Sequence, residues 1–415
     1  MSFGVIDMSE KQHYFYGLIP IEVEATPTER EQILRDFPVP VLPDEDQNFS
    51  LEQQEKGATV SIRVLLNDMN VQTTKTNNQF LKMTFSNNAG TIQAKMWDNQ
   101  GAVERHLPLL ENYSIFDIEG VVDEFRGFKS ITIYRLEPCE EEINPFSFLP
   151  YTKQNMEDFT VELFTYLNEL STPYHELSIA LMNRFWNEFS ISPAAKGFHH
   201  NYLGGLLKHT IGLMRIARFV LKQEADPFQA VMKLIQIVEK AYKKELWSHL
   251  KNDGKGEKLV WKDTIDHLYQ MLTGMMEHKE EQVNYDALLT SILLHDIGKI
   301  LEYDFAGKGY TGFDFLYPTA IQTSLQGRKK TGITMDELGM MVGHIPYGAL
   351  ILTKIVEQEG IALPLEEIHL ISHCILCHHG LPEWGASVRP QTMEGFIIHI
   401  VDYLDSRYEN TEAVK

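Results

Sequence analysis

The chain has 415 residues, of which 43% are apolar and 23% charged, so it is long enough for two or three globular domains. Its formal net charge of −21 repels polyanions, so nucleic acid can bind only where positive charge or metal is concentrated. Three cysteines exclude a disulfide framework and favour a reducing compartment.

The N-terminal part is acidic and carries no targeting signal that we recognise. No basic segment precedes an apolar one, and no run reaches eighteen apolar residues, so we predict a cytoplasmic protein with no membrane partner. Residues 1–56 hold four basic against twelve acidic residues and end in the Pro-rich "FPVPVLPDEDQNF". We predict an acidic N-terminal extension and linker, without independent function.

Residues 57–139 consist of short segments in which apolar and polar residues alternate. Turn residues separate five such segments, at 58–68, 79–87, 91–98, 113–125 and 129–137. Five strands at this spacing predict a small antiparallel barrel. With eight basic against nine acidic residues, positions 57–138 are nearly neutral, so if nucleic acid is bound at all, this segment and any metal site are where we expect it.

The order of these segments resembles the OB-fold of nucleic-acid-binding domains. Such barrels stack bases on aromatic side chains that lie beside basic ones. The candidate contacts are Phe85, Trp97, Phe128 and Lys129. For each aromatic residue, a place in the barrel core is the alternative.

From about residue 151 the apolar residues recur every three or four positions, which predicts an all-α domain over 151–415. The helical segments are 156–170, 173–189, 203–221, 285–301, 336–360, 365–380 and 392–409. Residues 223–283 are more polar, and we predict a helical insertion at about 223–283.

Candidate metal ligands lie at the ends of several of these helices. "LLHDIGKIL" places His295 and Asp296 side by side at the end of an apolar helix, where the local backbone can turn both inward. The further candidates are His209, His344, His378, His379 and Asp402. Imidazole and carboxylate together suit manganese, iron, zinc or nickel. Six ligands could hold two ions, an arrangement that can activate water and stabilise both oxygens of a phosphodiester displacement.

The order of His209, His295-Asp296 and Asp402 resembles the H…HD…D signature of the HD-domain phosphohydrolase superfamily. More narrowly, "FHHNYLGGLLKHTIGLMRIA", "LLHDIGKILEY" and "HHGLPEWGASVRPQTMEGFIIHIVDYLDSR", preceded by an OB-like domain, resemble the YhaM-type 3'-5' exoribonucleases of bacteria. The resemblance covers roughly residues 57–222 and 284–408. It implies a multidomain chain, in which a five-stranded OB-type β-barrel precedes an all-α HD-domain helical bundle.

The resemblance also implies a metal-dependent 3'-5' exoribonuclease that degrades single-stranded RNA, with single-stranded DNA as a further substrate. One or two divalent ions are expected per chain, with Mn²⁺ first and Fe, Ni, Co or Zn as alternatives; a homo-oligomer is left open. The implied metal ligands are His209, His295, Asp296, His344, His378 and Asp402. Lys299 is expected beside the scissile phosphate, where it offsets developing charge, and His379 near the substrate. The sequence does not decide between His378 and His379 as the ligand.

Four more residues are candidates for substrate contact. His199 and His200 precede the helix of His209 and are expected to contact phosphate, with capping or surface roles as the alternative. Trp384 is expected to stack on a base and Glu383 to orient a histidine, with rim packing as the alternative for each. The acidic N-terminal part and the insertion are longer than in typical members, which leaves substrate range and assembly undecided.

The cysteines of "HCILCHHG" suggest two other chemistries. A haem attached at Cys374 and Cys377 does not suit a reducing compartment, and a zinc site lacks ligands because Cys139 lies in another domain. We expect buried cysteines without a metal.

Two other functions remain as alternatives. One is HD-type hydrolysis of mononucleotides or cyclic dinucleotides, although the Gly-Tyr-Pro motif of cyclic-dinucleotide phosphodiesterases is replaced by "LPEWG". The other is single-strand binding without catalysis.

Overall fold

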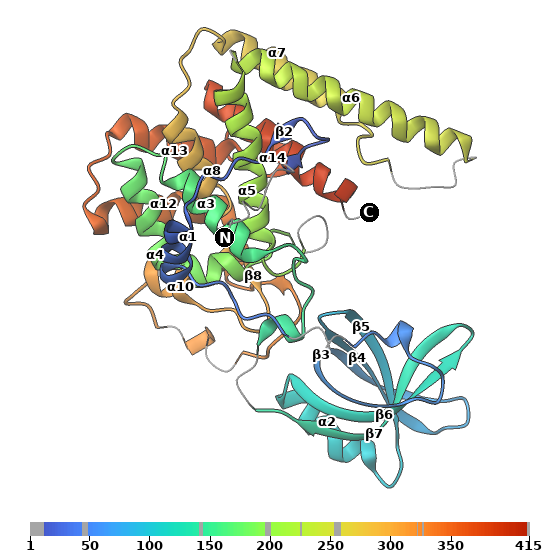
Figure 1. Cartoon of the computed structure of the whole chain (residues 1–415). Coiled ribbons are helices and arrows are strands. Elements are labelled where there is room, and N and C mark those ends of the chain that lie inside the picture. Colours follow the sequence, from blue (N-terminus) through green and yellow to red (C-terminus); the bar gives the residue numbers. More distant parts are fainter. Residues whose placement is uncertain are drawn as a thin grey trace, which may run out of the picture.

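The structure is a computed structural model that describes residues 12–43, 49–140, 144–195, 201–224, 226–252, 259–321, 323–325 and 328–412. Figure 1 shows a β-barrel joined to a larger helical domain. The elements are β1 His13–Tyr14, β2 Ile19–Pro20, α1 Pro27–Asp36, β3 Thr59–Thr73, β4 Gln79–Asn87, β5 Gly90–Trp97, α2 Ala102–Asn112, β6 Ile115–Phe125, β7 Phe128–Pro138, α3 Met156–Leu167, α4 Tyr174–Ile191, α5 Gly205–Arg218, α6 Pro227–Lys251, α7 Ile265–Met275, α8 Tyr285–Leu294, α9 Lys299–Glu302, β8 Tyr303–Asp304, α10 Thr311–Leu316, β9 Thr334–Met335, α11 Gly339–Val342, α12 His344–Glu359, α13 Leu365–Cys377 and α14 Met393–Glu412. Among the helices so described, none combines the length and apolarity that a bilayer crossing requires.

Five strands close the barrel in the order β3-β4-β5-β7-β6. Neighbouring strands are antiparallel, except that β5 and β7 pair in parallel through Ala94 with Ile131 and Lys95 with Thr132. The prediction of a five-stranded OB-type barrel followed by a helical domain is confirmed. Helix α2, which lies between β5 and β6 in the chain, was not predicted, because Pro108 interrupts its helical pattern.

The alternation along β4 decides which aromatic residues could meet a strand of nucleic acid. Leu81, Met83 and Phe85 point inward and are fully buried, because alternate residues of a strand face the same side. Phe85 packs edge to face against Phe116 inside the barrel, with 6.4 Å between ring centroids. The prediction that Phe85 contacts substrate is therefore wrong, since no base can reach its ring.

Helix α8 runs through the middle of the helical domain, where it contacts α4, α5, α13 and α14. Every residue from Ala287 to Leu294 is buried, as expected for a helix that is apolar on all sides. The C-terminal end of α8 therefore opens into the interior of the domain. A polar group that follows Leu294 must find its partners there.

Two helices predicted as continuous are interrupted, and both interruptions lie at candidate ligands. The segment 285–301 leaves the helix after Leu294 and forms a turn before α9. The segment 336–360 breaks at Gly343, whose φ of 83° suits glycine, so His344 begins α12. The turn packs closely on this break, because a Cβ on Gly298 would lie 2.1 Å from the carbonyl oxygen of His344.

The N-terminal part differs from the predicted linker. Within the described residues, Tyr14, Phe15, Ile19 and Phe37 are buried in the core of the helical domain. Phe37 stacks on Phe164, with 3.9 Å between ring centroids. This segment therefore belongs structurally to the helical domain, although the barrel separates the two in sequence.

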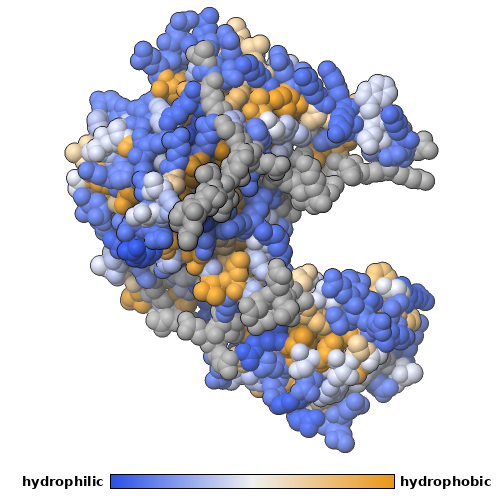
Figure 2. All heavy atoms as spheres, in the orientation of Figure 1, coloured by the Kyte–Doolittle hydropathy of each residue, from blue (hydrophilic) through white to orange (hydrophobic). Residues whose placement is uncertain are grey.

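The predicted insertion contains α6 and α7, which pack on each other. The buried residues of α6 all lie in its first half, and the last is Val238. The second half of α6 projects from the domain (Figure 1). In Figure 2 the surface is indented between this projecting helix and the barrel.

The burial of Phe85 predicts a change in stability. Phe85→Ala should lower the free energy of unfolding by about 3–5 kcal/mol, because it leaves a cavity in the barrel core. Trp97→Ala, at a side chain that is 37% exposed, is the matched control and should cost far less. Denaturant unfolding followed by circular dichroism would measure both, and equal losses would contradict the inward placement of Phe85.

Candidate metal centre

Six side chains from the ends and inner faces of five helices converge near the end of α8. His295 and Asp296 follow α8, His344 begins α12 and His378 follows α13, while the other two lie within α5 and α14. We call the following residues the metal cluster: His209, His295, Asp296, His344, His378 and Asp402. The structure thus brings together all the ligands that the resemblance implies.

Asp296 lies between two groups of histidines. Its Oδ2 atom is 3.3 Å from Nε2 of His295 and 3.6 Å from Nε2 of His209. Its Oδ1 atom is 3.5 Å from Nε2 of His344 and 3.7 Å from Nε2 of His378. One carboxylate therefore faces a pair of imidazoles with each of its oxygens, which is suitable for bridging two ions.

Each of these imidazoles is held through its Nδ1 atom. Nδ1 of His295 and of His378 lies 2.7 Å from the backbone carbonyl three residues earlier, which identifies Nδ1 as the donor. Nδ1 of His209 lies 2.7 Å from Asp405, and Nδ1 of His344 lies 2.7 Å from Glu302. These hydrogen bonds leave Nε2 of each ring directed at the cluster, and partners of this kind orient metal ligands.

The polar atoms at the centre suit a cation. Over the described residues, Oδ1 of Asp296 and the buried Nε2 atoms of His295, His344 and His378 have no hydrogen-bond partner. A buried polar atom without a partner costs about 1–3 kcal/mol. Divalent ions would coordinate all four atoms at once, and the donor set of imidazole and carboxylate fits such ions.

The charges of the cluster are strongly coupled. Burial by itself would raise the pKa of Asp296, but Lys299 and His295 hold it well below its usual range. Burial would likewise raise the pKa of Asp402, yet the hydrogen bond with His209 lowers it strongly. Burial lowers the pKa of His378 well below its usual value, with a further contribution from His379. The carboxylates are thus ionised and His378 is neutral, which are the forms that bind metal.

His209 behaves differently from the other histidines. Burial would lower its pKa, but hydrogen bonds to Asp402 and Asp405 raise it to about 10. Its Nε2 atom lies 3.1 Å from Oδ1 of Asp402. A cation bound in the cluster would displace the proton from this nitrogen.

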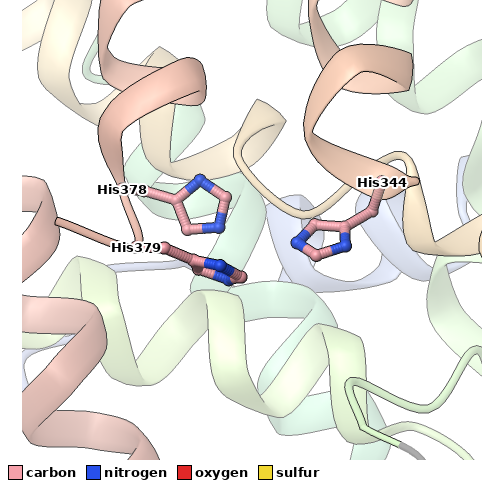
Figure 3. Close-up of side chains that lie close together, drawn as sticks. All are labelled: His344, His378 and His379. Carbon is pink, nitrogen blue, oxygen red and sulfur yellow. The ribbon is translucent and has the colours of Figure 1, made fainter. Parts of the chain in front are cut away.

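His379 lies beside the cluster, at its open side. Figure 3 shows the rings of His344, His378 and His379 turned toward one another from α12 and the end of α13. One ligand atom of each lies within 4.8 Å of those of the other two. Nδ1 of His379 is 2.8 Å from the carbonyl oxygen of Trp384, so Nε2 is directed inward. The geometry thus allows both His378 and His379 to approach an ion.

Lys299, in the first turn of α9, donates a hydrogen bond to Oδ2 of Asp296. Burial would lower its pKa, but the charge of Asp296 raises it, so the ammonium keeps its charge. The side chain also lines a cavity of about 220 Å³ over the cluster. Its positive charge is therefore available to an anion in that cavity.

The wall of this cavity contains two stacked aromatic rings. Trp384 and Tyr403 lie 5.6 Å apart with an interplanar angle of 11°. The guanidinium of Arg407 lies 3.4 Å from the centre of the Tyr403 ring. Glu383 does not orient a histidine as predicted, because its carboxylate lies 3.8 Å from Arg389. The neighbouring His379 is held by the carbonyl of Trp384 instead.

The remaining predicted residues lie elsewhere or outside the description. On the barrel, Trp97 is 37% and Phe128 79% exposed. Lys129 is not directed toward a strand of nucleic acid, because its ammonium donates to the carbonyls of Glu52 and Gln54. The predicted phosphate contacts at positions 199 and 200 lie outside the described residues. Cys374 and Cys377 are fully buried, as expected for packing residues.

Sequence reasoning missed the residues that hold the ligands in place. Asp405 accepts a hydrogen bond from Tyr14 as well as from His209, and a Cβ on Gly212 would lie 1.9 Å from its Oδ1. Glu302 holds His344 in the same way. In the sequence, these two carboxylates stand out only because each lies about one helical turn after a candidate ligand or after the His295-Asp296 turn. Such spacing is common on any helix.

Removing the charge of Asp405 should weaken metal binding. Asp405→Asn is expected to lower the affinity for Mn²⁺ by about 10–100-fold, because His209 loses the partner that orients it. Asp286→Asn, at a carboxylate that accepts from Ser171 outside the cluster, is the control. Isothermal titration calorimetry would measure both affinities, and an unchanged affinity in Asp405→Asn would contradict this role.

The raised pKa of His209 predicts a pH dependence of the metal-free protein. The unfolded pKa is about 6.5, and the folded pKa is about 10. The contribution to stability is therefore complete below pH ~6.5 and is lost as pH rises through about 10. In chelator, the free energy of unfolding should fall more steeply over this range in the wild type than in His209→Gln. Parallel curves would show that the pair with Asp402 contributes nothing.

The comparisons with known proteins agree with this geometry. Residues 264–407 match the HD domain, a range that contains the whole metal cluster except His209. The protein called 3'-5' exoribonuclease YhaM in Listeria welshimeri is 22% identical over 363 residues, which cover 87% of this chain and 89% of that protein. The protein of the same name in Bacillus pumilus is 23% identical over 357 residues, covering 85% and 86%.

These similarities extend across both the barrel and the helical domain. The matched domain contains the His295-Asp296 turn at the centre of the buried cluster. The chain therefore carries an HD domain and is similar along most of its length to proteins named 3'-5' exoribonuclease YhaM.

Proposed function

We propose that this protein is a metal-dependent 3'-5' exoribonuclease that hydrolyses phosphodiester bonds of single-stranded RNA. The direction of degradation is carried over from the name of the relatives. Manganese is the proposed metal, in one or two ions per chain. Single-stranded DNA as a further substrate, a cytoplasmic location and a homo-oligomer belong to the same proposal.

The observation that carries the proposal is the position of Asp296 between two pairs of imidazoles. Each of its oxygens faces one pair at 3.3–3.7 Å, and the carboxylate is 2% exposed. Divalent ions held by Asp296 and these imidazoles would activate water and stabilise charge on phosphoryl oxygens. This is the chemistry that hydrolysis of a phosphodiester requires.

Two residues beside the cluster are proposed to act on the substrate. Lys299 carries a buried positive charge into the cavity, where it would offset the negative charge that develops on the phosphate. His379 lines the same cavity with its Nε2 directed inward. This orientation supports the proposal that it acts near the leaving group or near a second ion.

The wall of the cavity supports the binding of a nucleotide. Trp384 is 44% exposed and stacked on Tyr403, so it offers a rigid aromatic edge at the mouth. Arg407, over the Tyr403 ring, adds a positive charge. We propose that Trp384 contacts the base or ribose of the terminal nucleotide, while Arg407 contacts its phosphate.

The barrel offers a second set of aromatic contacts. Trp97 packs against Phe80 with 5.2 Å between ring centroids, and Nζ of Lys95 lies 5.7 Å from its ring. At the β6–β7 turn, Phe125 and Phe128 are 70% and 79% exposed. Stacking on such side chains binds single strands without sequence preference. We propose that the barrel holds the part of the strand not yet degraded.

The proposal predicts the effect of removing the bridging charge. Asp296→Asn should abolish Mn²⁺-dependent degradation of single-stranded RNA, because neither pair of imidazoles retains its shared carboxylate. Time courses with 5'-labelled and 3'-labelled RNA, in manganese and in chelator, would measure the loss and the direction. The wild type should release the 3' label at once and shorten the 5'-labelled strand stepwise.

The control for this experiment is Asp286→Asn, which leaves the cluster intact. Full activity of Asp296→Asn would refute the assignment of the site. Binding of RNA without hydrolysis by the metal-loaded wild type would favour a non-catalytic single-strand-binding protein. Cleavage of a cyclic dinucleotide instead of RNA would favour a different HD chemistry.

A further inference from the structure

The projecting half of α6 carries a row of basic residues that neither the metal cluster nor the barrel uses. Lys240, Lys243, Lys244, Trp247 and Lys251 follow one another at i, i+3, i+4, i+7 and i+11. With 3.6 residues per turn, these positions share one face of the helix. All five side chains are exposed, and Trp247 is 65% exposed. We call these five residues the basic strip.

The acidic residues of the same half-helix are turned away from the basic strip. Glu239 accepts a hydrogen bond from Tyr269 of α7, at 2.9 Å. Glu245 lies 3.3 Å from the backbone nitrogen of Trp261. Both carboxylates therefore face the segment that packs against α6. A solvated helix face normally mixes both signs of charge, whereas this face carries one sign only.

The lysines of the basic strip do not pair with carboxylates elsewhere. Over the described residues, none of the four forms an ion pair, whereas Lys233 in the first half of α6 pairs with Glu224. The chain as a whole has a net charge of −21. Four unpaired positive charges in a row are thus a local exception to an acidic surface, and they create an attraction for anions.

The chemistry of the basic strip favours one kind of occupant. Lysines along one face of a helix can contact several phosphates of one strand, and a tryptophan among them offers a face for a base. An acidic protein surface would use the charges but not the exposed indole. In Figure 2, hydrophilic side chains predominate on the visible face of the projecting end of α6. The row of positive charges therefore favours an anionic partner over an apolar one.

We propose that the basic strip binds single-stranded nucleic acid, with its lysines on the phosphates and Trp247 stacked on a base. This inference rests on the proposed function, because the bound strand would be the part of the RNA substrate that lies outside the cavity. The strip lies on the far end of α6 from the core of the domain. It therefore extends the contact with a long strand beyond the barrel and the metal cluster.

The test compares the full-length wild type with K240E/K243E/K244E/K251E. Fluorescence anisotropy with a labelled single-stranded RNA in chelator measures affinity without degradation. The variant is expected to bind on the order of tenfold or more weakly at low salt, and the dependence of log K on log salt should fall by about 0.7 per lost contact. The control is K240R/K243R/K244R/K251R, which keeps the charges and should bind as the wild type does.

Trp247 is tested separately. Trp247→Ala should weaken binding by about 5–150-fold, the range for one lost stacking contact of ~1–3 kcal/mol, while Trp247→Phe should restore most of the affinity. Manganese content and circular dichroism show whether each variant keeps its metal site and fold. Wild-type affinity in both the charge-reversal variant and Trp247→Ala would overturn the proposal.

Two further outcomes separate this proposal from its neighbours. If charge reversal changes the oligomeric state in analytical ultracentrifugation but not RNA binding, the strip is a contact between copies of the chain and the proposal fails. If the wild type binds RNA through the basic strip but degrades none, the proposed exoribonuclease function fails, while the inference that the strip binds nucleic acid is supported. The two conclusions can thus be refuted independently.

Discussion

The whole site depends on burying the carboxylate of Asp296 at the end of an apolar helix. A carboxylate that is 2% exposed must be compensated, and here Lys299, His295 and His209 surround one oxygen while His344 and His378 face the other. Helix α8 is buried along its length, so the turn that follows it can only point into the domain. The breaks before α9 and α12 place His295 at the end of α8 and His344 at the start of α12. At these helix ends, each ring can turn toward this carboxylate.

A second layer holds the imidazoles, and it joins distant parts of the chain. His209 is oriented by Asp405, which also accepts from Tyr14 across 391 residues of sequence. Gly212 permits this contact, because any side chain there would occupy the position of the carboxylate. The N-terminal segment, acidic and Pro-rich in sequence, thus helps to hold His209, a proposed metal ligand. Glu302 holds the ring of His344, and two helix-end carbonyls hold the rings of His295 and His378. As a result, every Nε2 is directed at the centre of the cluster.

An acidic protein that handles a polyanion must concentrate its favourable charges. The nearly neutral barrel displays exposed aromatics, the cavity holds Lys299 and Arg407 beside the metal cluster, and the projecting half of α6 carries lysines without acidic neighbours on the same face. The chain as a whole has a net charge of −21, which opposes the binding of a polyanion. This distribution would confine nucleic acid to a few places on the surface. The negative net charge would then restrict where a strand binds without preventing its binding.

Local patterns were sufficient for the architecture and for naming the residues that converge at the end of α8. Alternation with a period of two predicted the barrel, a period near 3.6 predicted the helical domain, and the adjacency of His295 and Asp296 identified the centre. Local patterns could not show that Phe85 faces the core, that Lys129 is engaged by carbonyls, or that residues 12–37 pack on the helices, because each depends on contacts across the fold. The sequence by itself determined which residues are chemically able to bind metal. Only the tertiary structure decided that His209 and His344 present their Nε2 atoms and that Asp296 stands between two pairs, since both depend on contacts between segments far apart in the chain.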